Sequence, residues 1–158
     1  MKARIQGVAA QMQKFEFFFG ISLGQLVLRH SDNLSRTLQK ADISAAEGQD
    51  VTAMTVTVLQ SLRTADKFDL FFVRVRAAAS QHDIEEPRLP RKRMVPRRLD
   101  DGSAPAAFPA SVEDHYRPIY HEALDLITAC IQDRFNQPGY KTYCSVQSLL
   151  LKAAAKLP

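Results

Sequence analysis

Apolar residues recur at steps of three or four along the first part of the chain. The stripe contains Ile5, Val8, Met12, Phe15, Phe19, Leu23 and Leu26. This spacing follows one face of a helix with 3.6 residues per turn, and it predicts a helix that ends near His30. Four more apolar residues fall on its other faces, namely Phe17, Phe18, Ile21 and Leu28. A helix that is apolar on several faces is normally buried, so we expect its second half to be covered on nearly all sides.

Helical signals continue in the next segment. Ser31 or Asp32 is placed to cap a short helix that carries Leu34 and Leu38. Ser44-Ala-Ala-Glu47 has the spacing of a capping box, in which the serine hydroxyl accepts from an orphan amide and the glutamate reaches back to the cap amide. The apolar-facing positions after this box repeat at helical spacing: Val51, Met54, Thr55, Val58, Leu59 and Leu62.

An aromatic-rich stretch extends this pattern towards Ser80. Its members are Phe68, Phe71, Phe72 and Val75. Asp66 is placed to start a new helix at this point. A single kinked helix through both stretches fits the pattern equally well.

The C-terminal third carries the cleanest amphipathic pattern. Ser111-Val-Glu-Asp114 is a second capping box, and the stripe after it contains Val112, Tyr116, Ile119, Tyr120, Ala123, Ile127, Cys130, Ile131 and Phe135. Pro118 predicts a kink or a delayed start, because proline lacks the amide hydrogen that a helix interior uses. Gln137-Pro138-Gly139 ends this helix. A last helix is predicted from Val146, Leu149, Leu150 and Ala153.

Proline divides the helical halves of the chain. Five of the eight prolines fall between residues 87 and 109, so residues 84–110 are predicted to form a long irregular connection. The fold class we expect is all-α, a bundle of five or six helices with a long proline-rich basic loop. Residues 1–83 form the N-terminal half, 84–110 the loop, and 111–158 the C-terminal half of one domain.

The positive charge of the chain lies in that loop. The 158 residues include 21 Lys and Arg and 17 Asp and Glu, which gives a formal charge of +4. Residues 87–99 contain six basic residues and no acid: Arg88, Arg91, Lys92, Arg93, Arg97 and Arg98. Such a segment is a candidate for contact with nucleic-acid phosphates or for a nuclear import signal. A solvated loop without a partner explains it equally well.

Catalytic, cofactor and metal motifs are missing from the sequence. His121 and Asp125 lie one helical turn apart, but a surface pair explains them better than a catalytic dyad. Cys130 falls on an apolar stripe and is predicted to be a small core residue, whereas the place of Cys144 is left open. The longest apolar run, Phe17 to Leu28, has 12 residues, and a membrane span needs about 20. We therefore expect no enzyme activity, no cofactor and no membrane partner.

Several stretches in order resemble one known family. They are residues 3–20 (ARIQGVAAQMQKFEFFFG), 28–39 (LRHSDNLSRTLQ), 44–51 (SAAEGQDV), 86–98 (EPRLPRKRMVPRR), 115–127 (HYRPIYHEALDLI) and 133–140 (DRFNQPGY). This arrangement resembles the hAT-superfamily transposases and their domesticated relatives, the zinc finger MYM-type proteins. Its most specific element is the stretch with Leu34, Ser35, Leu38 and Gln39.

The resemblance implies a part of the family's helical insertion region. That region interrupts an RNase H-like domain with an Asp-Asp-Glu metal site. By the resemblance, the first two aspartates belong upstream of Met1 and the glutamate beyond Pro158, so no catalytic or metal residue carries over. The family's Arg-Trp motif is also missing, since the chain has no Trp.

The leading functional hypothesis is a non-catalytic fragment or domesticated remnant of a hAT-type transposase. It would contribute to nucleic-acid contact or to self-association, and it would reside in the nucleus or otherwise in the cytoplasm. The apolar first helix is the expected contact for a second copy or a parent protein, with Phe18 and Ile21 on one shared face. The alternative is a helical protein-interaction module with no DNA role.

Overall fold

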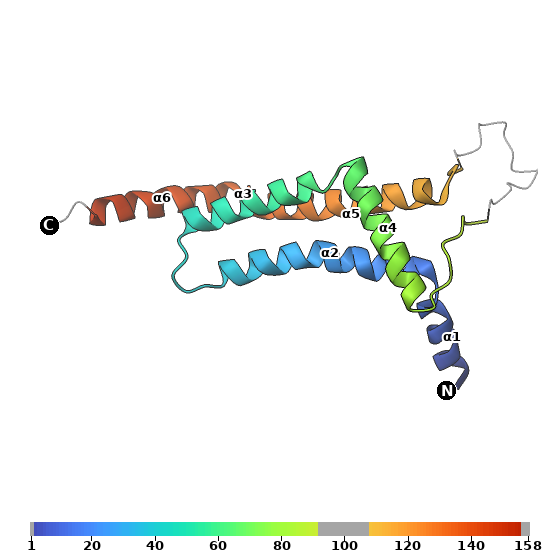
Figure 1. Ribbon diagram of the computed structural model, residues 1–158. Helices are drawn as coiled ribbons and strands as arrows, with labels where there is room; N and C mark the ends of the chain where they lie inside the picture. The colour runs from blue at the N-terminus through green and yellow to red at the C-terminus, as the bar shows by residue number, and fades with distance from the viewer. Residues whose placement is uncertain (1, 92–107, 156–158) are drawn as a thin grey trace, which may run out of the picture.

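The computed structural model describes residues 2–91 and 108–155, and this part of the chain is all-α. It contains six helices and no strand (Figure 1). Their bounds are α1 Lys2–Met12, α2 Phe15–Leu38, α3 Ala45–Ser61, α4 Ala65–Gln81, α5 Val112–Phe135 and α6 Pro138–Ala154. The predicted fold class is therefore confirmed. The described parts of the predicted loop, residues 84–91 and 108–110, contain neither helix nor strand.

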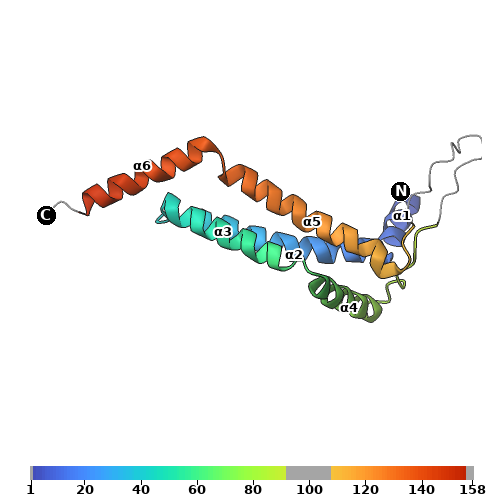
Figure 2. The same ribbon diagram turned by 90° about the horizontal axis from the view of Figure 1, so that it is seen from above.

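Three long helices form the body of an elongated molecule. α3 packs against both α2 and α5, and α2 also contacts α5. α4 crosses this group near the start of α2, whereas α6 continues beyond the opposite end of the bundle (Figures 1 and 2). Because the helices are arranged side by side over a long distance, each one keeps a large part of its surface in solvent.

The predicted first helix is in fact two helices. Lys14 has an extended backbone, with φ −81° and ψ 139°, and it separates α1 from α2. The amide of Glu85 donates a 3.2 Å hydrogen bond to the carbonyl of Gln13, which fixes this break. α1 turns away from the bundle, so Val8 and Met12 are exposed instead of continuing the core stripe.

The predicted end of α2 near His30 is also wrong. α2 runs to Leu38, and Leu34 continues its buried face, so no new helix starts at Ser31 or Asp32. The carboxylate of Asp32 instead pairs with Arg36 one turn later, at 2.9 Å. Such a pair supports a continuous helix.

Both predicted caps are present, the first as a full capping box and the second only through its serine. The Ser44 hydroxyl accepts from the Glu47 amide at 3.2 Å, and the Glu47 carboxylate accepts from the Ser44 amide at 2.8 Å, which confirms the capping box. Ser111 accepts from the amide of Asp114 at 3.0 Å, but the described residues show no bond from the Ser111 amide back to the Asp114 carboxylate, so the second box is only a serine cap. α5 starts at Val112 and includes Pro118, so the delayed start is ruled out.

α3 and α4 are separate helices, which decides between the two alternatives that the sequence allows. The cap of α4 is Thr64, whose hydroxyl accepts from the amide of Lys67, and not Asp66. α4 is thereby free to turn across the bundle, and this turn brings its aromatic residues against α2 and α5.

An aromatic cluster holds α2, α4 and α5 together. Its members are Phe15, Phe19, Phe68, Phe71, Phe72, Tyr116 and Tyr120, all buried. Several ring pairs meet edge to face, such as Phe15 and Tyr116 with centroids 5.4 Å apart. This geometry is favourable for aromatic pairs. The hydroxyl of Tyr120 donates to the carbonyl of Leu62 at 3.0 Å, which joins α5 to the end of α3.

Candidate interaction surfaces

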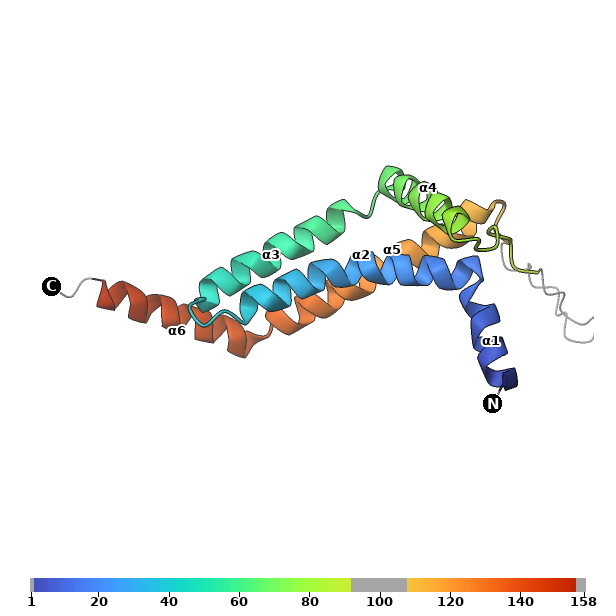
Figure 3. The ribbon, with the colours of Figure 1, turned by 60° about the horizontal axis from the view of Figure 1, so that its bottom comes forward.

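An apolar stripe runs along the solvent side of α2. We call it the outer stripe; its residues are Phe17, Ile21, Gly24 and Leu28. Phe17 is 41% exposed, Ile21 55% and Leu28 63%, so the expectation that these faces would be covered is wrong. α2 lies at the edge of the bundle, and its other side packs on α3 and α5. Figure 3 shows α2 in front of α5, with α1 turned away from the bundle.

Packing within one copy does not require a glycine at position 24 of the outer stripe. A Cβ atom built at Gly24 would meet nothing within 4 Å, and the same holds at neighbouring Gly20. Gly48 is different, because a Cβ there would lie 3.2 Å from both Leu38 and Tyr140. The internal fold therefore explains Gly48 but not Gly24.

The second apolar surface belongs to α6, whose first half is anchored on α3. The amide of Ala45, at the start of α3, donates to the side chain of Gln147 at 2.6 Å. The Cys144 thiol and the Tyr140 hydroxyl both donate towards the carbonyl of Ala45, at 3.6 and 3.5 Å. Cys144, which the sequence left open, is thus a buried contact residue of α6.

The C-terminal part of α6 extends past the bundle (Figure 2). Leu149, Leu150 and Leu151 are 68%, 65% and 55% exposed. Three consecutive residues of a helix point in three directions, so this end of α6 is apolar and exposed on most of its circumference. The predicted helix is present, but its predicted stripe is not part of the core.

Ion pairs connect α5 to α4 and to the end of α3. Arg63 donates to both carboxylate oxygens of Asp125, with the second bond at 2.9 Å. These hydrogen bonds hold the pKa of Asp125 below its ordinary value. Arg117 lies 5.0 Å from the centre of the Phe68 ring and also pairs with Asp69 at 3.4 Å.

His121 lies near the pair of Arg63 and Asp125 and forms no dyad with Asp125. Burial first, and then the charge of Arg63, lowers the pKa of His121, and its Nδ1 atom is buried without a hydrogen-bond partner among the described residues. Asp125 is engaged by Arg63 instead.

Of the six candidate basic residues, the structure places two. Arg88 and Arg91 are exposed on the irregular segment that follows α4. The other four lie outside the described residues: Lys92, Arg93, Arg97 and Arg98. Glu86, near the start of this segment, pairs with Arg76 of α4 at 3.0 Å. This pair holds the start of the segment against α4.

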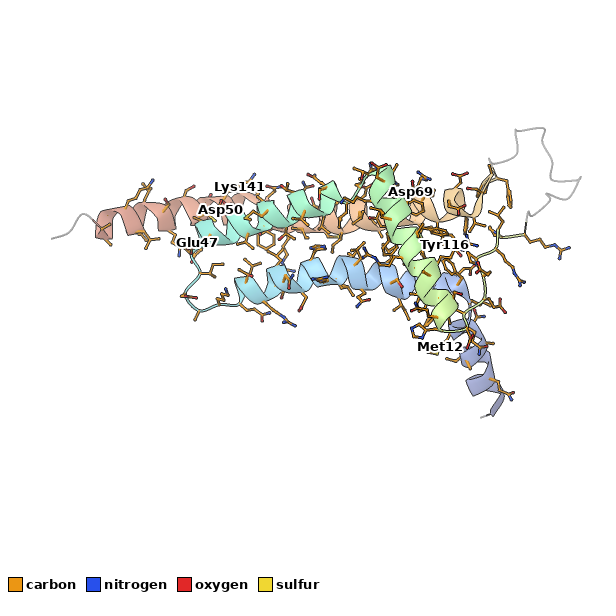
Figure 4. All side chains as sticks on the ribbon, in the orientation of Figure 1. Met12, Glu47, Asp50, Asp69, Tyr116 and Lys141 are labelled. Carbon is orange, nitrogen blue, oxygen red and sulfur yellow. The ribbon has the colours of Figure 1, made fainter. Side chains whose placement is uncertain are left out.

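Two open grooves flank α5. One lies between α3 and α5 and is lined by Thr52, Val56 and Gln132. Asp50 and Lys141 lie near its end, where α3 meets α6 (Figure 4). The second groove, between α2 and α5, is lined by Leu34, Leu38, Ile131 and the exposed Cys130, which is not the core residue that its stripe predicted.

The described residues of the grooves hold no metal-binding cluster. Within residues 2–91 and 108–155, no three His, Cys, Asp or Glu side chains lie close enough to hold a metal. Burial, aided by the charge of Glu16, raises the pKa of Tyr116 to about 12. That phenol lies inside the aromatic cluster, behind α4 in Figure 4, and is a packing residue.

The hydropathy of the helices was compared with that of membrane-spanning segments. None of the helices in the described ranges is long and apolar enough to cross a bilayer. Comparison of the chain with protein-family models, with curated proteins and with solved structures finds no match. The exposed apolar faces of α2 and α6 are the candidate interaction surfaces of the chain.

Proposed function

We propose that this chain is a non-catalytic helical assembly module that acts by self-association. The observation that carries the proposal is the outer stripe of α2. Its three large residues are more exposed than apolar side chains of a well-packed helix, and they are aligned on one face. Contiguous exposed apolar surface on a folded protein marks an interaction site.

The apolar residues of the outer stripe are better explained by association than by the packing of one copy. The bundle already has an aromatic core that does not involve the outer stripe. Polar residues at positions 17, 21 and 28 would leave that core intact and improve solubility. Apolar residues there are explained when another surface covers them, because burial of apolar area drives association.

Transposase descent is part of the same proposal. The ordered stretches that resemble hAT-superfamily proteins span most of the chain, and the resemblance assigns none of the Asp-Asp-Glu residues to it. A remnant of this kind would retain binding surfaces and lose strand cleavage. Purified protein with Mg²⁺ or Mn²⁺ and labelled duplex DNA should leave the DNA intact. Cleavage that one carboxylate substitution abolishes would contradict the proposal.

Nucleic-acid contact is a second candidate, carried by the basic segment. Arg88 and Arg91 are exposed, and their segment leaves the bundle at the end opposite to α6 (Figure 1). It is therefore accessible to a phosphate backbone, or to an import receptor that would bring the chain into the nucleus. The alternative without a DNA role is a protein-interaction module that uses α2 and α6 alone.

Sedimentation velocity over a hundredfold range of protein concentration tests the proposed function. We expect the weight-average sedimentation coefficient to rise with concentration from the value of one copy to that of two. A coefficient that stays at the value of one copy would contradict self-association. If the chain then binds a different protein without associating with itself, the protein-interaction module is the better explanation.

A further inference from the structure

The outer stripe has the spacing of a helix-pairing seam. Its residues, at positions 17, 21, 24 and 28, are separated by steps of four, three and four. Alternate steps of three and four give the 3.5-residue repeat with which two helices pack along their length. At a rise of 1.5 Å per residue the stripe is about 16 Å long.

Gly24 gives this seam a place for close approach. Glycine in a helix interior lowers helix stability relative to alanine, and nothing inside one copy requires it at this position. Ile21, one turn earlier, is a large side chain that lacks a cover. A reversed second copy supplies the complement, because an axis between residues 22 and 23 brings Ile21 of each copy onto Gly24 of the other.

Charge selects the reversed orientation. Lys14 and Asp32 are 18 residues apart, which is five helical turns, so they flank the two ends of the stripe on the same side. Both are exposed, and the side chain of Asp32 stays 55% exposed beside Arg36. In a reversed pair each Lys14 lies beside the second copy's Asp32. In a parallel pair the two Lys14 residues would lie at the same end on opposite edges of the seam, and neither would reach an Asp32.

We propose that two copies of the chain associate through the outer stripe of α2 in antiparallel orientation. Phe17 of each copy packs against the second copy's Leu28, Ile21 covers Gly24, and Lys14 pairs with Asp32. This inference rests on the proposed self-association and specifies its surface and register. A different protein on this stripe, or self-association through α6, would be the competing results of the experiment below.

The experiment mixes two single charge variants. In Lys14→Asp protein alone, an antiparallel pair would bring two carboxylates together at each end of the stripe. In Asp32→Lys protein alone, it would bring two ammonium groups together there. Like charges in contact disfavour a complex, so we expect each variant alone to dissociate about tenfold more readily than the wild type. An equal mixture restores an opposite-charge pair at each end and should associate within about threefold of wild type. The loss in each variant alone, followed by recovery in the mixture, is the result specific to the reversed orientation.

Exposed charges on the α2–α3 turn provide the matched control. Lys40→Asp and Asp42→Lys make the same changes away from the stripe and should leave sedimentation unchanged, alone or mixed. Circular dichroism melts of all variants verify that they fold. If each stripe variant alone associates as tightly as the wild type, the antiparallel α2 interface is overturned. Self-association would then use another surface. A wild type that never associates would instead overturn the proposed function itself.

Discussion

Neighbouring side chains of α2 differ sharply in their roles. Phe19 is 1% exposed within the aromatic cluster, whereas Phe17, two positions earlier, is on the outer stripe. Phe19→Ala should lower the free energy of unfolding by about 3–5 kcal/mol, since it removes a fully buried ring and leaves a cavity. Phe17→Ala is the matched control and should cost well under half of that. Urea unfolding monitored by circular dichroism measures both, at a concentration where the protein is monomeric. Equal losses would contradict the assigned faces.

The capping box links a single residue to the pH dependence of stability. Hydrogen bonds from the Ser44 amide and hydroxyl lower the pKa of Glu47. A carboxyl whose pKa is lowered by folding contributes stability above its unfolded pKa, and this contribution is lost as pH falls through the folded pKa. Ser44→Ala should therefore lower stability by about 1 kcal/mol at pH 7 and by less under acid conditions. Thermal melts at pH 7 and pH 3 test this, with exposed Ser145→Ala as the control. An equal loss at both pH values would contradict the coupling.

At the scale of the element, local signals predict what local physics determines. The serine caps at Ser44 and Ser111 and the 3.6-residue periodicity locate the starts of α3 and α5, because the partners lie three or four residues apart. The break at Lys14 has no such signal, because a bond from the distant amide of Glu85 fixes it. The continuation of α2 past Ser31 has a weak local signal, the pair of Asp32 and Arg36, but the cap chemistry of Ser31 and Asp32 competes with it, and the packing of Leu34 in the core favours the longer helix. Tertiary contacts decide both cases.

Hydrogen exchange should divide α6 into two parts. Contacts with Ala45 hold the helix as far as Gln147, whereas Leu149 to Leu151 have no comparable cover. Amides in segments with few buried contacts open at a low free energy. We expect amides after Gln147 to exchange at least about tenfold faster than those around Cys144, measured by mass spectrometry on overlapping peptides. Uniform protection along α6 would show that its C-terminal end is covered in solution.

At the scale of the whole molecule, the excess positive charge belongs to one segment. If the basic segment binds duplex DNA, the affinity should be independent of sequence and fall steeply with salt. Replacing Arg91, Lys92 and Arg93 by alanine removes about three phosphate contacts and should flatten the logarithmic salt slope by roughly 2.7. Fluorescence anisotropy with a labelled duplex measures the slope. An unchanged slope would assign the contacts elsewhere, and no binding at low salt would remove the DNA role.

The candidate surface could be predicted from the sequence only in part. An apolar first helix suggests an interface, and Ile21 does lie on the outer stripe. Phe18 does not share that face, because it is half-buried against the core and its ring lies 6.1 Å from that of His82. Apolar pattern alone cannot separate a core face from an outer face. That separation requires the position of α4, which no local signal contains.

The most direct test of the account is sedimentation equilibrium of the Ile21→Lys variant. This change puts a charge in the middle of the outer stripe without touching the aromatic core. Leu70→Lys on α4 is the control, since Leu70 is similarly exposed on another face. Self-association through α2 predicts a folded monomer for Ile21→Lys and wild-type association for Leu70→Lys. A wild type that stays monomeric, or an Ile21→Lys variant that associates as tightly as the wild type, would contradict it.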